Sequence, residues 1–250
     1  MENNFNLVDI SFFEDYAEMA ERFDQLISER RYREAKEEAL RIPAPDLAAI
    51  FGEMAASKMT LIFRLLPKEL AAETFVDMES EEQYRLIESF SDSELSEILD
   101  ELYIDDTVDI IEEMPANVVK RILRTVEGGD RALINRILRY PKGSAGTVMT
   151  TEYVRFIKDM TVESALTHIR RVAIDKETIY TCYVTDTDRH LIGTVSARDL
   201  LVSELDTPLS DIMEENVIYA YTYDDREAVA RSLDKYGLLA MPVVDKEMRL

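Results

Sequence analysis

The sequence predicts a multi-domain protein, in which an all-α superhelical repeat domain precedes an α/β region built from two copies of one motif. Three observations lead to this fold class. Only one of the seven glycines, Gly52, lies before residue 128, so a long glycine-poor segment gives way to a different kind of structure. Helical patterns recur at equal spacing in the first half. A strand-and-helix pattern occurs twice in the second half.

The first half is built from a two-helix unit. Four dipeptides are equally spaced along it and each precedes a helical pattern: Ile42-Pro43, Leu66-Pro67, Phe90-Ser91 and Met114-Pro115. Proline is tolerated in a first helical turn, and Ser80-x-x-Gln83 and Ser91-x-x-Glu94 predict capping boxes. A two-helix unit cannot bury its apolar face alone, so we expect stacked units in an α-solenoid. Residues 15–40 predict a leading helix or helix pair.

The second half follows a different order of elements. Residues 151–158 predict a short extended segment, and residues 160–171 predict a helix with apolar residues at helical spacing. Two β-branched and aromatic strands flank the turn at 186–189, and a helix follows at 198–204. The pattern then restarts and stops at Leu250. We expect the second copy to be truncated, because its last strand and helix are missing.

Composition excludes several classes of protein. The 250 residues include 51 acids and 29 bases, and the net charge of −22 argues against binding of nucleic acid or an anionic membrane surface. No stretch without Asp, Glu, Lys or Arg exceeds nine residues, and the N-terminus lacks a signal-peptide pattern. A single cysteine, Cys182, fits a reducing compartment. We therefore expect a soluble protein of the cytoplasm.

Residues suited to catalysis are scarce, and we expect no enzyme. There are two histidines, no Ser–His or Cys–His spacing, and no glycine-rich phosphate-binding or dinucleotide-binding motif. A transition-metal site is not expected, because such sites need clustered Cys or His. We expect His190, beside Arg189, to be an exposed loop residue.

Carboxylates are abundant and unevenly spread. Residues 69–113 contain 17 acids and one base. Asp105, Asp109, Glu112 and Glu113 fall on one helix face, and Asp106 adds to its first turn. Two interpretations stay open: a solvated acidic face with acids favoured at the helix N-terminus, or a surface for a hard divalent cation such as Mg²⁺ or Ca²⁺. The same alternatives apply to a second acidic group at residues 224–227.

A further candidate site is the segment from Thr194 to Asp199. A strand ends there in hydroxyl residues and a helix begins with Arg198 and Asp199. Backbone N–H groups and an arginine suit a phosphate, and an aspartate suits ribose hydroxyls. Alternatively, Ser196 simply caps the helix.

These motifs together resemble a known family. The openings Val148-Met149 and Ile212-Met213, the helix TVESAL, the strand YVTD and the segment GTVSARDL resemble a pair of CBS domains. The acidic repeat with YIDDTVDIIEEMP and the junction AGTVMTTEYV extend the resemblance to the cytosolic part of the MgtE magnesium transporter family. The resemblance covers nearly all of the chain.

The resemblance implies a function and a set of site residues. It implies that Mg²⁺ binds between the helical domain and the CBS pair and favours the closed pore, and that the CBS pair also binds ATP. The implied metal-binding residues are Asp105, Asp106, Asp109, Gly146, Thr147, Asp225 and Glu227, and the implied nucleotide-binding residues are Ser196, Arg198 and Asp199. One family acid falls on Gly237, so the metal site of the second copy departs from the family pattern.

The resulting prediction divides the chain into an acidic helical-repeat domain at 1–138, a first CBS domain at 139–204 and an incomplete second one at 205–250. It describes a Mg²⁺-sensing region on the cytoplasmic face of the cell membrane. Its expected partners are Mg²⁺, its own transmembrane domain and a second copy bound through the CBS domains, without nucleic acid. One alternative is an adenine-nucleotide sensor with the helical domain as a docking scaffold. Another is a purely structural scaffold, since the repeats also resemble those of flagellar motor switch proteins.

Overall fold

The computed structural model describes residues 16–250 and divides them into two compact units. The first unit contains the described residues up to Leu102 together with Asp109–Arg131. The second contains Tyr103–Val108 and Ala132–Leu250. The predicted domain boundaries after residues 138 and 204 stay predictions.

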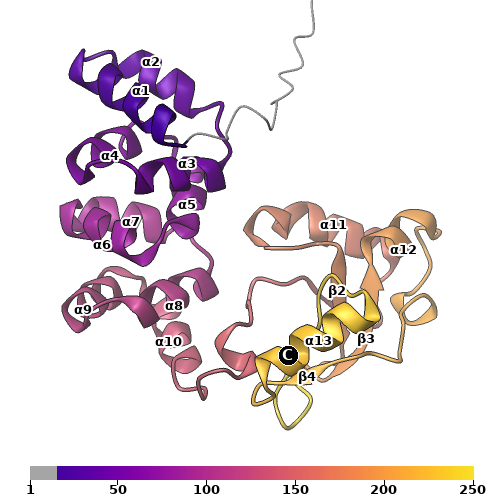
Figure 1. Cartoon of the computed structure of the whole chain (residues 1–250). Coiled ribbons are helices and arrows are strands. Elements are labelled where there is room, and N and C mark those ends of the chain that lie inside the picture. The colour runs from indigo at the N-terminus through magenta and orange to yellow at the C-terminus, as the bar shows by residue number, and fades with distance from the viewer. Residues whose placement is uncertain (1–15) are drawn as a thin grey trace, which may run out of the picture. The chain divides into compact units, whose positions relative to one another are not determined.

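From residue 16 onward, ten short helices follow one another without an intervening strand, as the regular repeat predicts (Figure 1). They are α1 (Tyr16–Ser28), α2 (Tyr32–Ala39), α3 (Ala44–Gly52), α4 (Ala56–Phe63), α5 (Lys68–Asp77), α6 (Ser80–Ser89), α7 (Asp92–Leu99), α8 (Ile104–Glu113), α9 (Ala116–Thr125) and α10 (Gly128–Ile137). Within the first unit, α3 packs on α5, α5 on α7, α7 on α9, and α4 on α6. These helices therefore contact their counterparts in the next repeat, which is the packing of an α-solenoid.

Phenylalanines from successive repeats form the core of the first unit. The ring of Phe63 lies 6.4 Å from that of Phe51, 6.2 Å from that of Phe75 and 5.5 Å from that of Phe90. All four side chains are buried. Because these rings come from four consecutive segments, their burial requires neighbouring repeats to stack.

One of the two predicted capping boxes is confirmed and the other is wrong. The Ser91 hydroxyl accepts from the Glu94 amide, and the Glu94 carboxylate accepts from the Ser91 amide at 2.8 Å. Ser80 is instead the first residue of α6, and its N-cap is Glu79. The Gln83 amide group donates to the Phe75 carbonyl at 2.8 Å, so its side chain joins two helices and does not cap its own.

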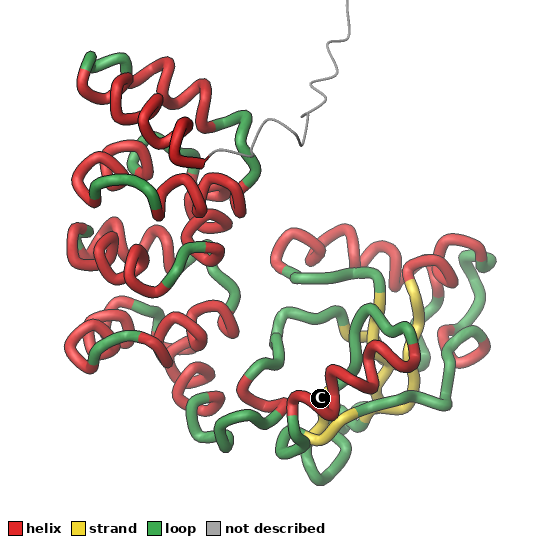
Figure 2. Tube along the Cα trace, in the orientation of Figure 1, coloured by secondary structure: helices red, strands yellow, loops and turns green. Residues whose placement is uncertain are grey.

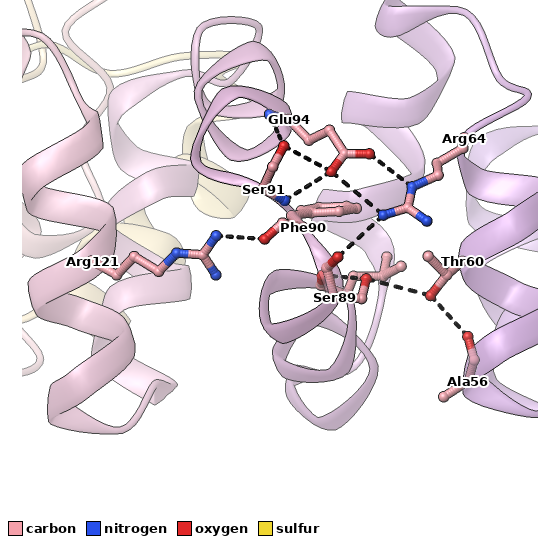
Figure 3. A network of polar contacts seen from close by, with 9 residues as sticks. Ala56, Thr60, Arg64, Ser89, Phe90, Ser91, Glu94 and Arg121 are labelled. Carbon is pink, nitrogen blue, oxygen red and sulfur yellow. Dashed lines mark hydrogen bonds and ion pairs between the residues drawn. The ribbon is translucent and has the colours of Figure 1, made fainter.

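Two arginines bind the end of α6 and the start of α7 (Figure 3). Arg64 donates to the Ser89 carbonyl at 3.1 Å and to the Glu94 carboxylate at 2.7 Å. Arg121 donates to the carbonyls of Ile87 and Phe90, both at 2.6 Å. The last carbonyls of a helix lack the regular intrahelical partner, and these guanidinium groups supply donors to them.

The second unit has the predicted strand-and-helix order. Its strands are β1 (Arg155–Ile157), β2 (Thr181–Thr185), β3 (Leu191–Ser196), β4 (Ala220–Tyr221) and β5 (Val243–Val244), and its helices are α11 (Val162–Val172), α12 (Ala197–Val202) and α13 (Arg226–Tyr236). β2 pairs with β1 in parallel and with β3 antiparallel, and β4 pairs with β5 in parallel. The parallel pair thus occurs twice, once in each copy of the motif. The copies are joined mainly by loop (Figure 2).

The first copy encloses an apolar core between its sheet and helices. Phe156, Val162, Cys182 and Val184 are almost fully buried there. Burial raises the pKa of the Cys182 thiol to about 12, which keeps the sulfur protonated and unreactive.

α12 ends at Val202, two residues before the predicted end. The predicted fold class is confirmed.

Candidate metal centre

The first turn of α8 holds a carboxylate with one oxygen that lacks a partner. The Asp105 Oδ1 atom is buried and has no hydrogen-bond partner among the described residues. Burial, followed by the neighbouring charges of Asp106 and Glu177, raises the pKa of Asp105 to about 7. An ionised carboxylate in such a place needs either a proton or a positive charge beside it. The chemistry of this group therefore fits a hard cation.

Two further acids, which the sequence did not single out, act on the same turn. Burial, Glu177 and Glu152 raise the pKa of Tyr103, and both glutamates raise that of Asp105. The Glu177 amide donates to the Glu152 carbonyl at 3.1 Å, which fixes the two backbones side by side. Glu152 lies in the junction motif that carried the family resemblance, whereas no sequence pattern marks Glu177.

The acids of α8 become more accessible along the helix. Asp105 and Asp106 are both half-buried, and Asp109 is exposed one turn further along, as are Glu112 and Glu113. The predicted acidic face therefore exists and extends from half-buried carboxylates at its N-terminal end to solvated ones. The helix dipole explains why acids are favoured in the first turn, but it provides no hydrogen-bond donor or cation for the buried Asp105 oxygen.

The structure places the junction, residues 145–154, beside the second copy of the strand-and-helix motif. The Ala145 amide donates to the Asp224 carbonyl at 2.7 Å, and the Gly146 amide to the Thr222 carbonyl at 2.8 Å. Ser144 and Asp225 form an isolated antiparallel bridge. The predicted site residues Gly146 and Asp225 are far apart in sequence, and these backbone bonds place their segments side by side.

Of the three predicted metal-binding side chains near this junction, two form local hydrogen bonds and one is exposed on the surface. Asp225 is the N-cap of α13, where its Oδ1 atom accepts from the Ala228 amide at 2.9 Å. The Thr147 hydroxyl is buried and donates to the Ser144 carbonyl. Glu227 is exposed and lies 3.7 Å from Arg231. Helix capping thus explains the position of Asp225, as one of the two interpretations from the sequence predicted. It does not explain Glu227, which is exposed.

Gly237 has a conformational reason for being glycine. It ends α13 in the left-handed conformation, with φ of +62°. An acidic side chain there would be strained, since only glycine adopts this conformation freely. The conformation at the end of α13 therefore accounts for glycine at this position.

The candidate nucleotide residues form a complete capping box. The Ser196 hydroxyl accepts from the Asp199 amide at 3.1 Å, and Asp199 Oδ2 accepts from the Ser196 amide at 3.1 Å and lies 2.5 Å from the Ser196 hydroxyl. Capping of α12 is therefore confirmed, and Arg198 stays exposed beside it. A cavity of about 1300 Å³ within the second unit is not lined by any of the three residues.

A third group of acids is explained by a turn. Side-chain atoms of Asp186, Asp188 and His190 lie within 4.8 Å of one another. Asp186 Oδ1 accepts from the amides of Asp188 and His190, and its Oδ2 lies 2.8 Å from the His190 ring. The contact with His190 lowers the pKa of Asp186. The expectation of a freely exposed His190 is wrong, because this ring is half-buried against the turn.

Among residues 16–250, none of the helices combines the length and apolar composition needed to cross a bilayer.

Two family models match the chain. The model of the MgtE intracellular N domain matches residues 42–143, and that of the CBS domain matches residues 145–205. The magnesium transporter MgtE of Thermus thermophilus is 36% identical over 225 residues, covering 88% of this chain and 49% of the relative. That of Bacillus subtilis is 27% identical, covering 92% of this chain and 51% of the relative. The chain thus spans about half the length of these curated relatives.

Two solved structures share the whole fold. The cytosolic domain of the Mg²⁺ channel MgtE in complex with ATP matches with a TM-score of 0.87 and 36% identity, covering 92% of this chain and 94% of that one. The soluble part of a magnesium transporter matches with a TM-score of 0.85 and 28% identity, covering 94% and 93%. These relatives are transporter domains, and no enzyme family is indicated.

Proposed function

Since this chain belongs to the MgtE family, as its cytosolic helical domain and CBS pair, we propose that it is the Mg²⁺-sensing region of a magnesium transporter. Its helical-domain acids Asp105, Asp106 and Asp109 are one half of the proposed metal surface. The other half consists of the Gly146 and Thr147 junction with Asp225 and Glu227. Mg²⁺ between the two halves supplies the positive charge that favours a closed pore.

The observation that carries the proposal is the buried, unpartnered oxygen of Asp105. Burial and neighbouring carboxylates raise the pKa of this group, so its ionised form is disfavoured without a cation. Two carboxylates about 4 Å apart repel by roughly 4 kcal/mol at an effective dielectric near 20. Acidic faces of this kind separate unless cations lie between them, which makes their spacing sensitive to the Mg²⁺ concentration.

The test is small-angle X-ray scattering and titration calorimetry of the full chain with and without Mg²⁺. We expect a smaller radius of gyration in millimolar Mg²⁺, with heats that saturate, and loss of both in Asp105→Asn and in Asp225→Asn. NaCl of matched ionic strength controls for screening. Glu112→Gln, on the same helix, is the matched control and should respond as wild type. Equal dimensions in chelator and in Mg²⁺ would refute the proposal.

The proposed setting is the cytoplasmic face of the cell membrane. There the chain's partners are its own transmembrane domain, as in the full-length relatives, and a second copy. An exposed apolar pair on α12, Leu201 and Val202, is the proposed contact between the CBS domains of two copies, since each side chain is 75% exposed.

A second candidate function is adenine-nucleotide sensing. It is favoured by the solved relative at 36% identity, which is in complex with ATP. Arg198 is exposed at the start of α12, next to the Ser196–Asp199 cap. It is the residue that we propose to contact a phosphate. In this case Arg198→Ala should abolish thermal stabilisation by ATP, whereas Asp105→Asn should leave it unchanged. No stabilisation of the wild type by ATP would remove this candidate.

A further inference from the structure

The end of the solenoid has a groove that the proposed metal surface does not use. It has a volume of about 650 Å³ and lies along α9, within the first compact unit. Its apolar lining includes Ala116, Val119 and Leu123, and its basic lining consists of Lys120, Arg124 and Arg131. The floor is therefore apolar, and cationic side chains stand around it.

The apolar floor is one continuous stripe of α9. Ala116, Val119 and Leu123 are spaced i, i+3 and i+7, which places them on a single face of the helix. A neighbouring face, with Val118 and Ile122, is buried in the solenoid core. The helix thus carries more apolar surface than the solenoid covers, because Val119 and Leu123 are only half-buried. Surface of this kind is typical of a groove that receives another helix.

The charge of this region is opposite to that of the preceding repeats. α9 contains three bases and no acid, and residues 114–131 contain four bases and two acids. Residues 69–113 contain 17 acids and one base. A basic edge on a chain with a net charge of −22 selects acidic ligands locally while the rest of the surface repels them.

The rim cations are exposed to solvent. Arg124 lies 3.3 Å from Asp92, and both side chains are more than 60% exposed, so this ion pair is easily exchanged. Arg131 donates to the Val126 carbonyl at 3.0 Å, which anchors its guanidinium group at the groove. Lys120 is exposed. Lys120 and Arg124 come from α9 and Arg131 from α10, so both helices contribute cations that a ligand can reach.

We propose that this groove docks an acidic amphipathic helix of a partner protein. Apolar side chains of that helix at i, i+3 and i+7 meet the Val119–Leu123 floor. Its Asp or Glu side chains pair with Lys120, Arg124 and Arg131. A second copy of this chain and an anionic lipid surface are the alternative occupants, and the test below distinguishes them from the partner helix.

The test measures fluorescence anisotropy of a labelled helical peptide of about 14 residues. Its leucines stand at i, i+3 and i+7, with glutamates on both flanks. We expect the full chain to bind it, and Lys120→Glu with Arg124→Glu to weaken binding by more than about tenfold. A peptide with lysines in place of the glutamates should bind the double variant better than wild type. Arg33→Glu with Lys36→Glu, on the exposed side of α2, is the matched control.

Three outcomes would overturn the proposal. One is peptide binding that does not depend on charge, seen as equal affinity for the acidic and basic peptides or as no effect of Lys120→Glu with Arg124→Glu. Another is self-association in sedimentation velocity that is lost in Lys120→Glu, which assigns the groove to a second copy. The third is co-sedimentation with phosphatidylserine vesicles without peptide binding. Circular dichroism of each variant confirms that the solenoid stays folded.

Discussion

The amide nitrogen of Gly146 lies 2.8 Å from the carbonyl oxygen of Thr222, in a backbone hydrogen bond that joins the junction to the second copy of the motif. The approach is so close that a Cβ on Gly146 would come 2.8 Å from the same oxygen and 2.7 Å from the Tyr140 ring. Only glycine permits this contact. It holds the junction beside Asp225, on which one half of the proposed metal surface depends.

We therefore expect Gly146→Ala to lower the free energy of unfolding by about 1–3 kcal/mol, as overpacking of a close contact does. Mg²⁺-dependent compaction should weaken with it. The matched control is Gly129→Ala in α10, where a Cβ meets nothing within 4 Å. That change should be neutral or stabilising by up to about 1 kcal/mol. Chemical denaturation measures both, and equal stability of Gly146→Ala and wild type would contradict the assigned contact.

Arg121→Ala should destabilise the solenoid by about 1–3 kcal/mol, because it removes the donor to the Phe90 carbonyl (Figure 3) and one of the two donors to the Ile87 carbonyl, which also accepts from the Phe90 amide. Arg121→Lys should recover only part of the loss, since an ammonium group cannot reproduce the guanidinium fork. Arg124→Ala is the control: its exposed ion pair with Asp92 contributes little, so a change within about 0.5 kcal/mol is expected. Urea unfolding followed by circular dichroism distinguishes these outcomes.

The raised pKa of Asp105 predicts how stability depends on pH without metal. The unfolded carboxyl titrates near a pKa of about 3.9, and the folded one near about 7. Between these values the folded chain binds the extra proton, so stability falls as pH rises through this window. Asp105→Asn should therefore raise Tm at pH 8 in chelator and change it little below pH 4. A shift of Tm by Asp105→Asn that is the same at both pH values would contradict the raised pKa.

The exposed pair on α12 predicts how the chain assembles. We expect Leu201→Asp with Val202→Asp to convert a dimer to a monomer in light scattering, because charged side chains cannot be buried in an apolar contact. Leu239→Asp, at a leucine that is 85% exposed elsewhere in the second unit, should leave the dimer intact. A dimer that persists in the double variant places the contact on another surface.

The architecture was largely predictable from local patterns. The equal spacing of the repeats, the Ser91–Glu94 cap and the alternation of strands are each determined by a few neighbouring residues, and the structure confirms them. The prediction of a capping box at Ser80 was wrong, because the Gln83 side chain instead donates a hydrogen bond to the Phe75 carbonyl of another helix. Likewise, the Asp186 carboxylate contacts the ring of His190, which we expected from the sequence to be an exposed loop residue.

By itself, the sequence determined the repeats, the acidic face of α8, the duplicated α/β motif and the residue types of the candidate site, because periodicity and charge are properties of nearby positions. Tertiary structure decided which of those carboxylates has a buried oxygen without a partner, and it added Glu152 and Glu177 to Asp105. It also decided that Gly146 meets Thr222, although the two are far apart in sequence. Burial and close backbone approach depend on distant segments that pack together, and no local pattern records them.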